Sequence, residues 1–257
     1  MAWNAGDDLP ACLDALHDSA GELGLEAIVV DNGSSDSTRE VLERREWVRT
    51  VFNERNHGLT VGRNQALSIS RGRIAVMLDA DTVPLPNSIR KLVTYLDGRP
   101  GVGLVAPKLL NSDGSLQLSC RRVPPARMPL IRRPPLSRWF EDSSAVDRHL
   151  MRDYDHRHAR AVDWVMGACQ CFRTELVDAL GGYDERIFFQ GGEDRDWCLR
   201  MWKHGLEVHY YPGAEMVHGY SHYTRDHPFS KQAVRAFTDF YYGYWKHRDV
   251  RHGVAPE

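Results

Sequence analysis

The sequence predicts an α/β fold in which a mostly parallel sheet is flanked by helices. Short apolar runs alternate with segments of helical periodicity throughout the first hundred residues, which is the rhythm of consecutive βα units. Two of these runs end directly in acidic loops, at 31–36 and 79–81. Open α/β sheets bind their ligands at the carboxyl ends of strands, so both loops become candidate binding segments.

The elements are expected in the following order along the chain. A helix starts near Leu9, after the capping candidates Asp7 and Asp8. Strands are then expected at 27–30, 48–52, 74–78 and 102–106, with helices around 41–42 and over 59–70 and 88–96. The second half adds a hairpin at 109–118, a helix ending near His204, and a strand at 206–211 that stops at a Pro-Gly turn.

Composition excludes several classes of protein. The chain has 257 residues, of which 42% are hydrophobic and 26% charged, so it can bury a large core and is not a disordered chain. Its 33 basic and 35 acidic residues give no reason to expect a nucleic-acid partner. The five cysteines lack zinc-site spacing, which predicts reduced thiols in the cytoplasm. No apolar run reaches the roughly 18 residues that span a membrane, and the first 20 residues do not form a signal peptide.

The strongest candidate for chemistry is the pair Asp79 and Asp81, one residue apart directly after an apolar strand. Carboxylate oxygens in such a loop suit Mg²⁺ or Mn²⁺ together with phosphate oxygens. The alternative is a solvated acidic turn. Asp31 and Asn32 follow another strand, where an aspartate can accept hydrogen bonds from a base or ribose or can form an Asx turn that caps the next helix.

Four further residues carry weaker signals. Arg63 lies in the first turns of a helix, where it either reaches a diphosphate or is a surface arginine. Glu193 and Asp194 begin another helix, either as a carboxylate base held ionised there or as acids that complement the helix dipole. His218 is one of twelve histidines, so it is weak evidence for a metal ligand by itself.

The order of these pieces resembles family 2 glycosyltransferases of the GT-A fold. The matching segments are VVDNGSSDST, NHGLTVGRNQAL, LDADT, VMGACQCFR, GGYDERIFFQGGEDRDWCLRMWKHG and VHYYPGAEMVHGYSH. They span roughly residues 3 to 245, and the subgroup they resemble is the rhamnosyltransferase-like enzymes of bacterial cell-wall and O-antigen assembly.

The resemblance implies a role for each candidate. It places Asp194 as the catalytic base with Glu193 beside it, and it makes Asp81 and His218 the ligands of Mg²⁺ or Mn²⁺. The residues that it assigns to the nucleotide sugar are Asn4, Asp31, Asn32, Arg63 and Asp79. One departure concerns the family's opening apolar strand, of which only Met1 to Asn4 is present, so the first strand is expected to be truncated.

The function implied is inverting transfer of a sugar from a nucleotide diphosphate, dTDP-rhamnose or a UDP-sugar, to a saccharide or lipid-linked saccharide. Two alternatives stay open at this point: a sugar-phosphate nucleotidyltransferase and a non-catalytic sugar-nucleotide-binding protein. The first would need an N-terminal glycine-rich phosphate loop, which is absent. A dinucleotide-dependent oxidoreductase would need G-x-G-x-x-G after its first strand, and that is absent too.

We expect one domain over 1–257, with a nucleotide-binding half (1–107), an acceptor and catalytic half (108–228) and a helical tail (229–257). Residues 121–138 hold six arginines, five prolines and no acid, which favours a long surface loop or flexible arm. Aromatic and basic residues also alternate over 229–248. The arm and tail together predict peripheral association with the cytoplasmic face of an anionic membrane, unless the arm is a solvated loop and the tail a packed helix.

Overall fold

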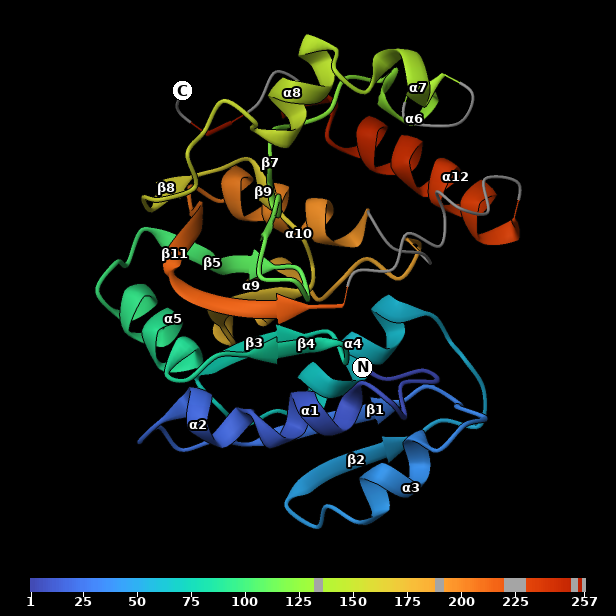
Figure 1. Cartoon of the computed structure of the whole chain (residues 1–257), viewed down its shortest axis with the longest axis vertical. Coiled ribbons are helices and arrows are strands. Elements are labelled where there is room, and N and C mark those ends of the chain that lie inside the picture. The colour runs from blue at the N-terminus through green and yellow to red at the C-terminus, as the bar shows by residue number, and fades with distance from the viewer. Residues whose placement is uncertain (132–135, 188–191, 220–229, 251–253, 256–257) are drawn as a thin grey trace.

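The structure is a computed structural model, and it describes residues 1–131, 136–187, 192–219, 230–250 and 254–255. Figure 1 shows helices on both sides of a central sheet, with the first 60 residues at one end of the molecule and residues 126–131 and 136–150 at the other. This is the α/β fold that the alternating pattern predicts.

The N-terminal part is a small parallel unit. It consists of α1 (Leu9–Asp14), α2 (Leu16–Ala20), β1 (Ala27–Asp31), α3 (Thr38–Glu43), β2 (Val48–Phe52) and α4 (Leu59–Ile69). β1 and β2 pair in parallel, from Ala27 opposite Val48 to Asp31 opposite Phe52. Ala2 adds a parallel bridge on the other side of β1, donating its N–H to the carbonyl oxygen of Val30 at 2.8 Å.

The main sheet combines strands from both halves of the chain. Its members are β3 (Ile74–Leu78), β4 (Thr82–Pro84), β5 (Val102–Leu110), β10 (Cys169–Arg173) and β11 (Glu207–His218), in the order β3-β10-β5-β11-β4. β3, β5 and β11 run in one direction, whereas β10 and β4 are antiparallel to their neighbours. Strands from before and after residue 107 therefore alternate within one sheet.

Two strands differ from the sequence expectation. β5 runs on to Leu110 and forms the expected hairpin with β6 (Leu116–Gln117). The expected end of a strand at the Pro-Gly pair is wrong, because β11 continues through Pro212 and Gly213 with an irregular register between Tyr211 and Glu215. A bulge accommodates the proline, which cannot donate to the ladder. As a result His218 is the last residue of β11.

Both faces of the main sheet are buried. Successive side chains of β10 point to opposite faces, and Cys169 and Cys171 belong to one apolar cluster while Phe172 belongs to another. α5 (Ser88–Asp97), α1 and α2 cover the first face through residues such as Leu92. α9 (Glu175–Leu180) and α10 (Glu193–Lys203) lie on the second, where Trp197 is fully buried.

The segment 121–138 is not the expected long loop or flexible arm in the part that the structure describes. It begins in β7 (Cys120–Arg121), which pairs with β9 (Trp164–Val165), and continues into α6 (Met128–Ile131) and α7 (Ser137–Phe140). α8 (Ser144–Leu150) follows, and a short β8 (Arg160–Ala161) pairs with β11. Four apolar residues of α6 and α8 form a separate small core, namely Met128, Ile131, Val146 and Leu150.

The C-terminal part is helical and packed. α12 (Lys231–Lys246) is followed by a 3₁₀ turn (Arg248–Val250). Tyr241 donates its hydroxyl to the carbonyl oxygen of Ala126 at 3.0 Å, and Lys246 lies 2.6 Å from Asp196 of α10. Of the tail's predicted interfacial aromatic residues, Phe229 lies outside the described residues and Phe240 packs against the small core of α6 and α8. Within the described ranges, no helix has the length and apolar character needed to cross a bilayer.

Candidate active site

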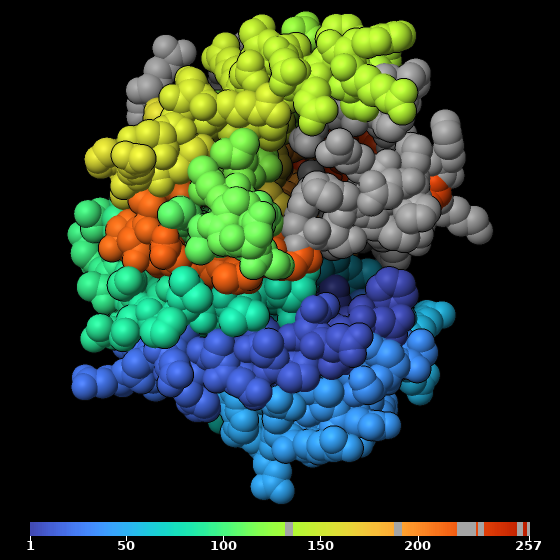
Figure 2. Space-filling model, in the orientation of Figure 1, coloured from blue at the N-terminus to red at the C-terminus, as the bar shows by residue number. Residues whose placement is uncertain are grey.

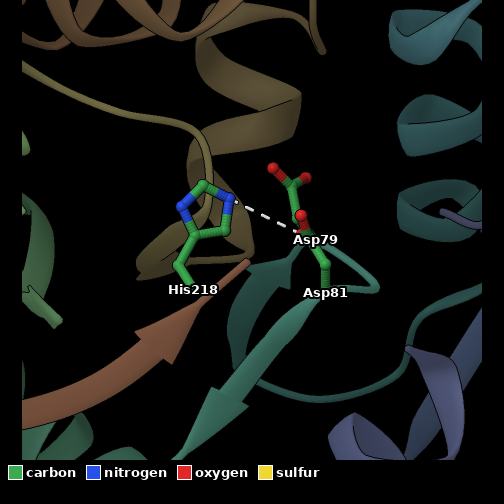
Figure 3. Close-up of side chains that lie close together, drawn as sticks. All are labelled: Asp79, Asp81 and His218. Carbon is green, nitrogen blue, oxygen red and sulfur yellow. Dashed lines mark ion pairs between the residues drawn. The ribbon is translucent and has the colours of Figure 1, made fainter. Parts of the chain in front are cut away.

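Two elements bring the acidic pair and the late histidine together. Asp79 and Asp81 lie in the turn between β3 and β4, and β4 pairs with the end of β11 so that Thr82 lies opposite His218. The three side chains can each present one ligand atom, and these atoms lie within 4.8 Å of one another. Nε2 of His218 is 3.5 Å from Oδ1 of Asp81, as Figure 3 shows. The residues expected at a metal site are thus brought together by the pairing of β4 with β11.

Gln117 fixes the orientation of that histidine. Oε1 of Gln117 lies 2.7 Å from Nδ1 of His218, and Nε2 of Gln117 donates to Oδ1 of Asn111 at 3.0 Å. Because the glutamine uses its N–H there, its oxygen accepts, and the proton of the neutral ring belongs on Nδ1. Nε2 then carries its lone pair toward Asp81, as a metal-ligating imidazole requires. Nothing in the sequence singled out Gln117, since only the strand pairing brings the hairpin beside β11.

The electrostatics of this cluster suit a cation. Burial, followed by the nearby Asp79 carboxylate, raises the pKa of Asp81 to about 7. Burial lowers the pKa of His218, although Asp79 acts in the opposite direction, so the ring favours its neutral form. Two carboxylates and a neutral imidazole are a donor set that accepts Mn²⁺ or Mg²⁺, and these three residues therefore fit such an ion.

Arg63 links the acidic turn to α10. Its guanidinium is 2% exposed, and Nη2 donates to Oδ1 of Asp79 at 2.8 Å and to the carbonyl oxygen of Gly167 at 3.0 Å. Nη1 lies 3.4 Å from Oε1 of Glu193. Burial alone would lower the pKa of Arg63, but Asp79 and Glu193, with Tyr183, outweigh it and raise that pKa. Arg63 is therefore not the surface arginine of the alternative interpretation.

Gly167 is a second residue that sequence reasoning missed. Its N–H donates to Oδ2 of Asp194 at 3.1 Å while its carbonyl accepts from Arg63. A Cβ at this position would lie 3.0 Å from both terminal nitrogens of Arg63, so a larger residue would displace the guanidinium. The only sequence signal is the glycine itself, within the segment VMGACQCFR.

Glu193 and Asp194 open α10 as expected, and both are buried. Oδ1 of Asp194 accepts the N–H of Arg195 at 2.7 Å, and Oε2 of Glu193 accepts the N–H of Gly192 at 3.1 Å. Burial nevertheless raises the pKa of both carboxyl groups, and for Glu193 the charge of Asp194 adds to it. Burial thus acts against the helix N-terminus, which was expected to keep Asp194 ionised.

The remaining predicted residues gather at the carboxyl end of β1. Asp31 accepts the N–H of Ser34 at 3.1 Å, which is an Asx-type contact within its own loop. Asn32 donates to the carbonyl oxygen of Gly58 at 3.0 Å and accepts the N–H of His57 at 3.0 Å. Asn4 accepts the N–H of Ser35 at 2.8 Å. Asn4, Asp31 and Asn32 therefore shape the loops at this end of β1, whereas Asp79, Asp81, His218, Arg63, Glu193 and Asp194 lie around the β3–β4 turn.

Two family models match the chain. The model described as glycosyl transferase family 2 matches residues 1–129, and the model described as glycosyl transferase family group 2 matches residues 74–249. Together they include the β3–β4 turn, the opening of α10 and the end of β11.

Curated relatives agree with these models. The chain is 26% identical to an N-acetylglucosaminyl-diphospho-decaprenol L-rhamnosyltransferase of Mycobacterium tuberculosis (strain ATCC 25618 / H37Rv), over 96% of this chain and 85% of the relative. It is 23% identical to the amylovoran biosynthesis glycosyltransferase AmsE of Erwinia amylovora, over 79% of this chain and 66% of that protein.

Solved structures share the fold at low identity. The mannosyltransferase PcManGT from Pyrobaculum calidifontis, in complex with GDP-Man and Mn²⁺, superposes with a TM-score of 0.61 at 20% identity. The match covers 99% of this chain and 64% of the mannosyltransferase chain. GalNAc-T7 with UDP, GalNAc and Mn²⁺ gives a TM-score of 0.55 at 18% identity, over 76% of this chain and 38% of its own. The fold is that of the GT-A glycosyltransferases, and the chain belongs to glycosyl transferase family 2, where it is rhamnosyltransferase-like.

Proposed function

We propose that this glycosyltransferase moves a sugar from a nucleotide diphosphate to an acceptor hydroxyl with inversion at the anomeric carbon, in the assembly of a cell-wall or other polysaccharide. The observation that carries the proposal is the junction of Asp79, Asp81 and His218 with the buried acids Glu193 and Asp194 through Arg63. Such a junction offers a cation site and a proton acceptor in one connected network.

Asp194 acts as the base in this proposal. It takes the proton of the acceptor hydroxyl as that oxygen forms its bond to the anomeric carbon, and the bond from that carbon to the diphosphate breaks. A single displacement of this kind inverts the configuration and needs no nucleophilic carboxylate. The raised pKa of the buried acids makes them stronger proton acceptors than exposed carboxylates.

Asp81 and His218 would hold Mg²⁺ or Mn²⁺, and the ion would supply positive charge for the leaving diphosphate. The mannosyltransferase and GalNAc-T7 structures, both of which contain Mn²⁺, support this assignment. Asp79 and Arg63 keep the turn in place through their 2.8 Å ion pair, next to the donor.

The donor side is proposed to lie in residues 1–107, with Asn4, Asp31 and Asn32 near the base and ribose. Residues 108–228 would then provide the catalytic and acceptor side, with 229–257 as the helical tail. The Mycobacterium tuberculosis relative is named for a decaprenol-linked substrate and a rhamnosyl product, which supports dTDP-rhamnose and a lipid-linked saccharide. The other donor and acceptor that we propose to test are a UDP-sugar and a free saccharide.

The test is turnover of a panel of nucleotide sugars by the full chain, with Mn²⁺ and with a chelator. We expect hydrolysis or transfer with one donor, loss of turnover in the chelator, and loss of turnover in Asp194→Asn. Asp178→Asn is the matched control, since Asp178 lies on α9 rather than α10. Binding of a nucleotide sugar without turnover of any donor would assign the chain instead to a non-catalytic sugar-nucleotide-binding role.

A further inference from the structure

Exposed apolar side chains concentrate on α6 and α7. Among the described residues ten large hydrophobic side chains are exposed, and four of them lie between residues 130 and 140. This α6–α7 surface consists of Leu130, Leu136, Trp139 and Phe140, which are 49%, 37%, 75% and 40% exposed. Contiguous exposed apolar side chains of this kind mark interaction surfaces, and Trp139 is the most exposed of the ten.

Of these two helices, α6 also has a buried inner face. Met128 and Ile131 of α6 are buried against Val146 and Leu150 of α8, and Phe240 of α12 packs on that core. The hydroxyl of Tyr241 adds a hydrogen bond to the backbone at Ala126. Because these contacts already anchor α6, its outward side chain Leu130 is not required to hold that helix in the fold.

Arginines border the α6–α7 surface. Arg127 and Arg138 are exposed, and neither forms an ion pair with any residue in the described part of the chain. The nearest acids in sequence are Glu141 and Asp142, and Asp142 lies 3.5 Å from Arg152. Tryptophan and phenylalanine bordered by uncompensated arginines match a bilayer interface, where rings lie among the headgroups and cations meet lipid phosphates.

We propose that the α6–α7 surface docks this protein on an anionic membrane, with Trp139 and Phe140 inserted at headgroup depth and Arg127 and Arg138 against lipid phosphates. A second copy of the chain fits less well, because a two-fold contact would bring Arg127 and Arg138 of both copies into one interface. Membrane docking rests on the proposed function, since it would bring the enzyme to a lipid-linked acceptor at the membrane surface.

The position of the surface defines a direction of docking. Figures 1 and 2 show residues 126–131 and 136–150 at one end of the molecule, and α3 and β2 at the opposite end. Trp47, which lies between α3 and β2, is 41% exposed, and the side chain of Arg44 is 79% exposed. These two residues therefore provide controls of the same chemistry that face away from the proposed membrane.

The experiment is co-sedimentation of the full chain with vesicles of phosphatidylcholine alone or mixed with phosphatidylglycerol, at low and high salt. We expect binding to the anionic vesicles only, weakened by salt. Arg127→Ser and Arg138→Ser should each lower the partition coefficient about fivefold, and Trp139→Ser should also lower it. Trp47→Ser and Arg44→Ser should leave it unchanged. All variants should keep the thermal midpoint of the wild type, as expected for exposed side chains.

Three outcomes would overturn the proposal. The wild type could fail to bind anionic vesicles at low salt, or Trp47→Ser could weaken binding as much as Trp139→Ser does. Light scattering could also show a dimer that Trp139→Ser dissociates, which would assign the surface to a second copy. Hydrolysis of a water-soluble nucleotide sugar separates this proposal from the proposed function: Trp139→Ser should retain it, whereas a wild type that binds vesicles without any turnover would contradict only the proposed function.

Discussion

At the scale of single residues, the hydrogen bond from His218 to Gln117 sets which nitrogen faces the acidic turn. Replacing Gln117 by alanine should weaken Mn²⁺ binding about tenfold or more, since residues that orient a ligating histidine typically contribute that much to metal affinity. Electron paramagnetic resonance of free Mn²⁺ measures the affinity, and ¹⁵N shifts of the imidazole report its tautomer.

Gln65→Ala is the matched control for that variant, because Gln65 bonds to Asn53 in the N-terminal unit. Unchanged affinity together with an unchanged tautomer in Gln117→Ala would show that the glutamine only supports the hairpin. A lower thermal midpoint alone would lead to the same conclusion.

Asp81 should make metal binding depend on pH near neutrality. Its pKa is raised to about 7, so the carboxyl group is protonated below that value and ionised above it. A proton and Mn²⁺ compete for the same oxygen, and affinity should therefore fall about tenfold per pH unit as pH drops below 7. The increase in melting temperature caused by Mn²⁺ should accordingly be larger at pH 8 than at pH 6.

Asp81→Asn should abolish that increase at both pH values, while Asp113→Asn, at the exposed turn of the hairpin, should preserve it. An equal Mn²⁺ effect in wild type at the two pH values would refute the assignment of Asp81 as the titrating ligand.

Asp194→Asn should lower kcat by about 10²-fold or more while donor affinity changes little, because the amide keeps the shape but cannot accept the proton. Burial raises the pKa of Asp194, so the acid limb of the wild-type kcat profile should lie above the ordinary range of an aspartate. If kcat were unchanged and only the unfolding midpoint fell, Asp194 would be a structural acid at the start of α10.

At the scale of elements, one carboxylate joins α10 to α12. Asp196 is fully buried and accepts from Arg200 at 2.9 Å, from Lys246 at 2.6 Å and from Nε2 of His247 at 2.8 Å. Asp196→Ala should therefore lower the free energy of unfolding by about 3–5 kcal/mol, as removal of one member of a buried ion pair does. Chemical denaturation measures this loss, and hydrogen exchange over α12 should show earlier opening.

Asp249→Ala offers the comparison, since its ion pair with Lys203 lies at the surface and should contribute no more than about 1 kcal/mol. Equal losses in the two variants would mean that the buried site does not anchor α12.

Elements could be predicted from the sequence where local pattern alone determines them. The strands at 48–52 and 74–78 have the observed bounds, because each is a compact run rich in β-branched or apolar residues. α6 and α7 could not be predicted, since each has only four residues, and α6 depends on tertiary contacts with α8 and α12. The predicted end of β11 came too early because a Pro-Gly pair usually marks a turn. Only the pairing with β5 shows that the strand continues through Pro212 and Gly213 with an irregular register.

At the scale of the whole molecule, the residues of the candidate site could be predicted, but the contacts that bring them together could not. The acidic turn after a strand is visible in the sequence, and the family resemblance supplied roles for Asp194 and His218. The ion pairs of Arg63 join residues 16 and 130 positions apart, which no spacing rule connects. Gln117 meets His218 across 101 positions, and only the packed sheet reveals that contact.

The interleaving of the main sheet also has a consequence for biosynthesis. β10 lies between β3 and β5, so those two strands have no shared neighbour until residues 169–173 have left the ribosome. Until then β3 and β5 lack the strand that pairs with both of them, and unpaired strand edges are prone to aggregation and to capture by chaperones. Synthesis of this protein should accordingly depend on chaperone supply until translation passes β10. Its acidic turn should become ordered late, because the N–H of Asp79 donates to the carbonyl oxygen of Ala168.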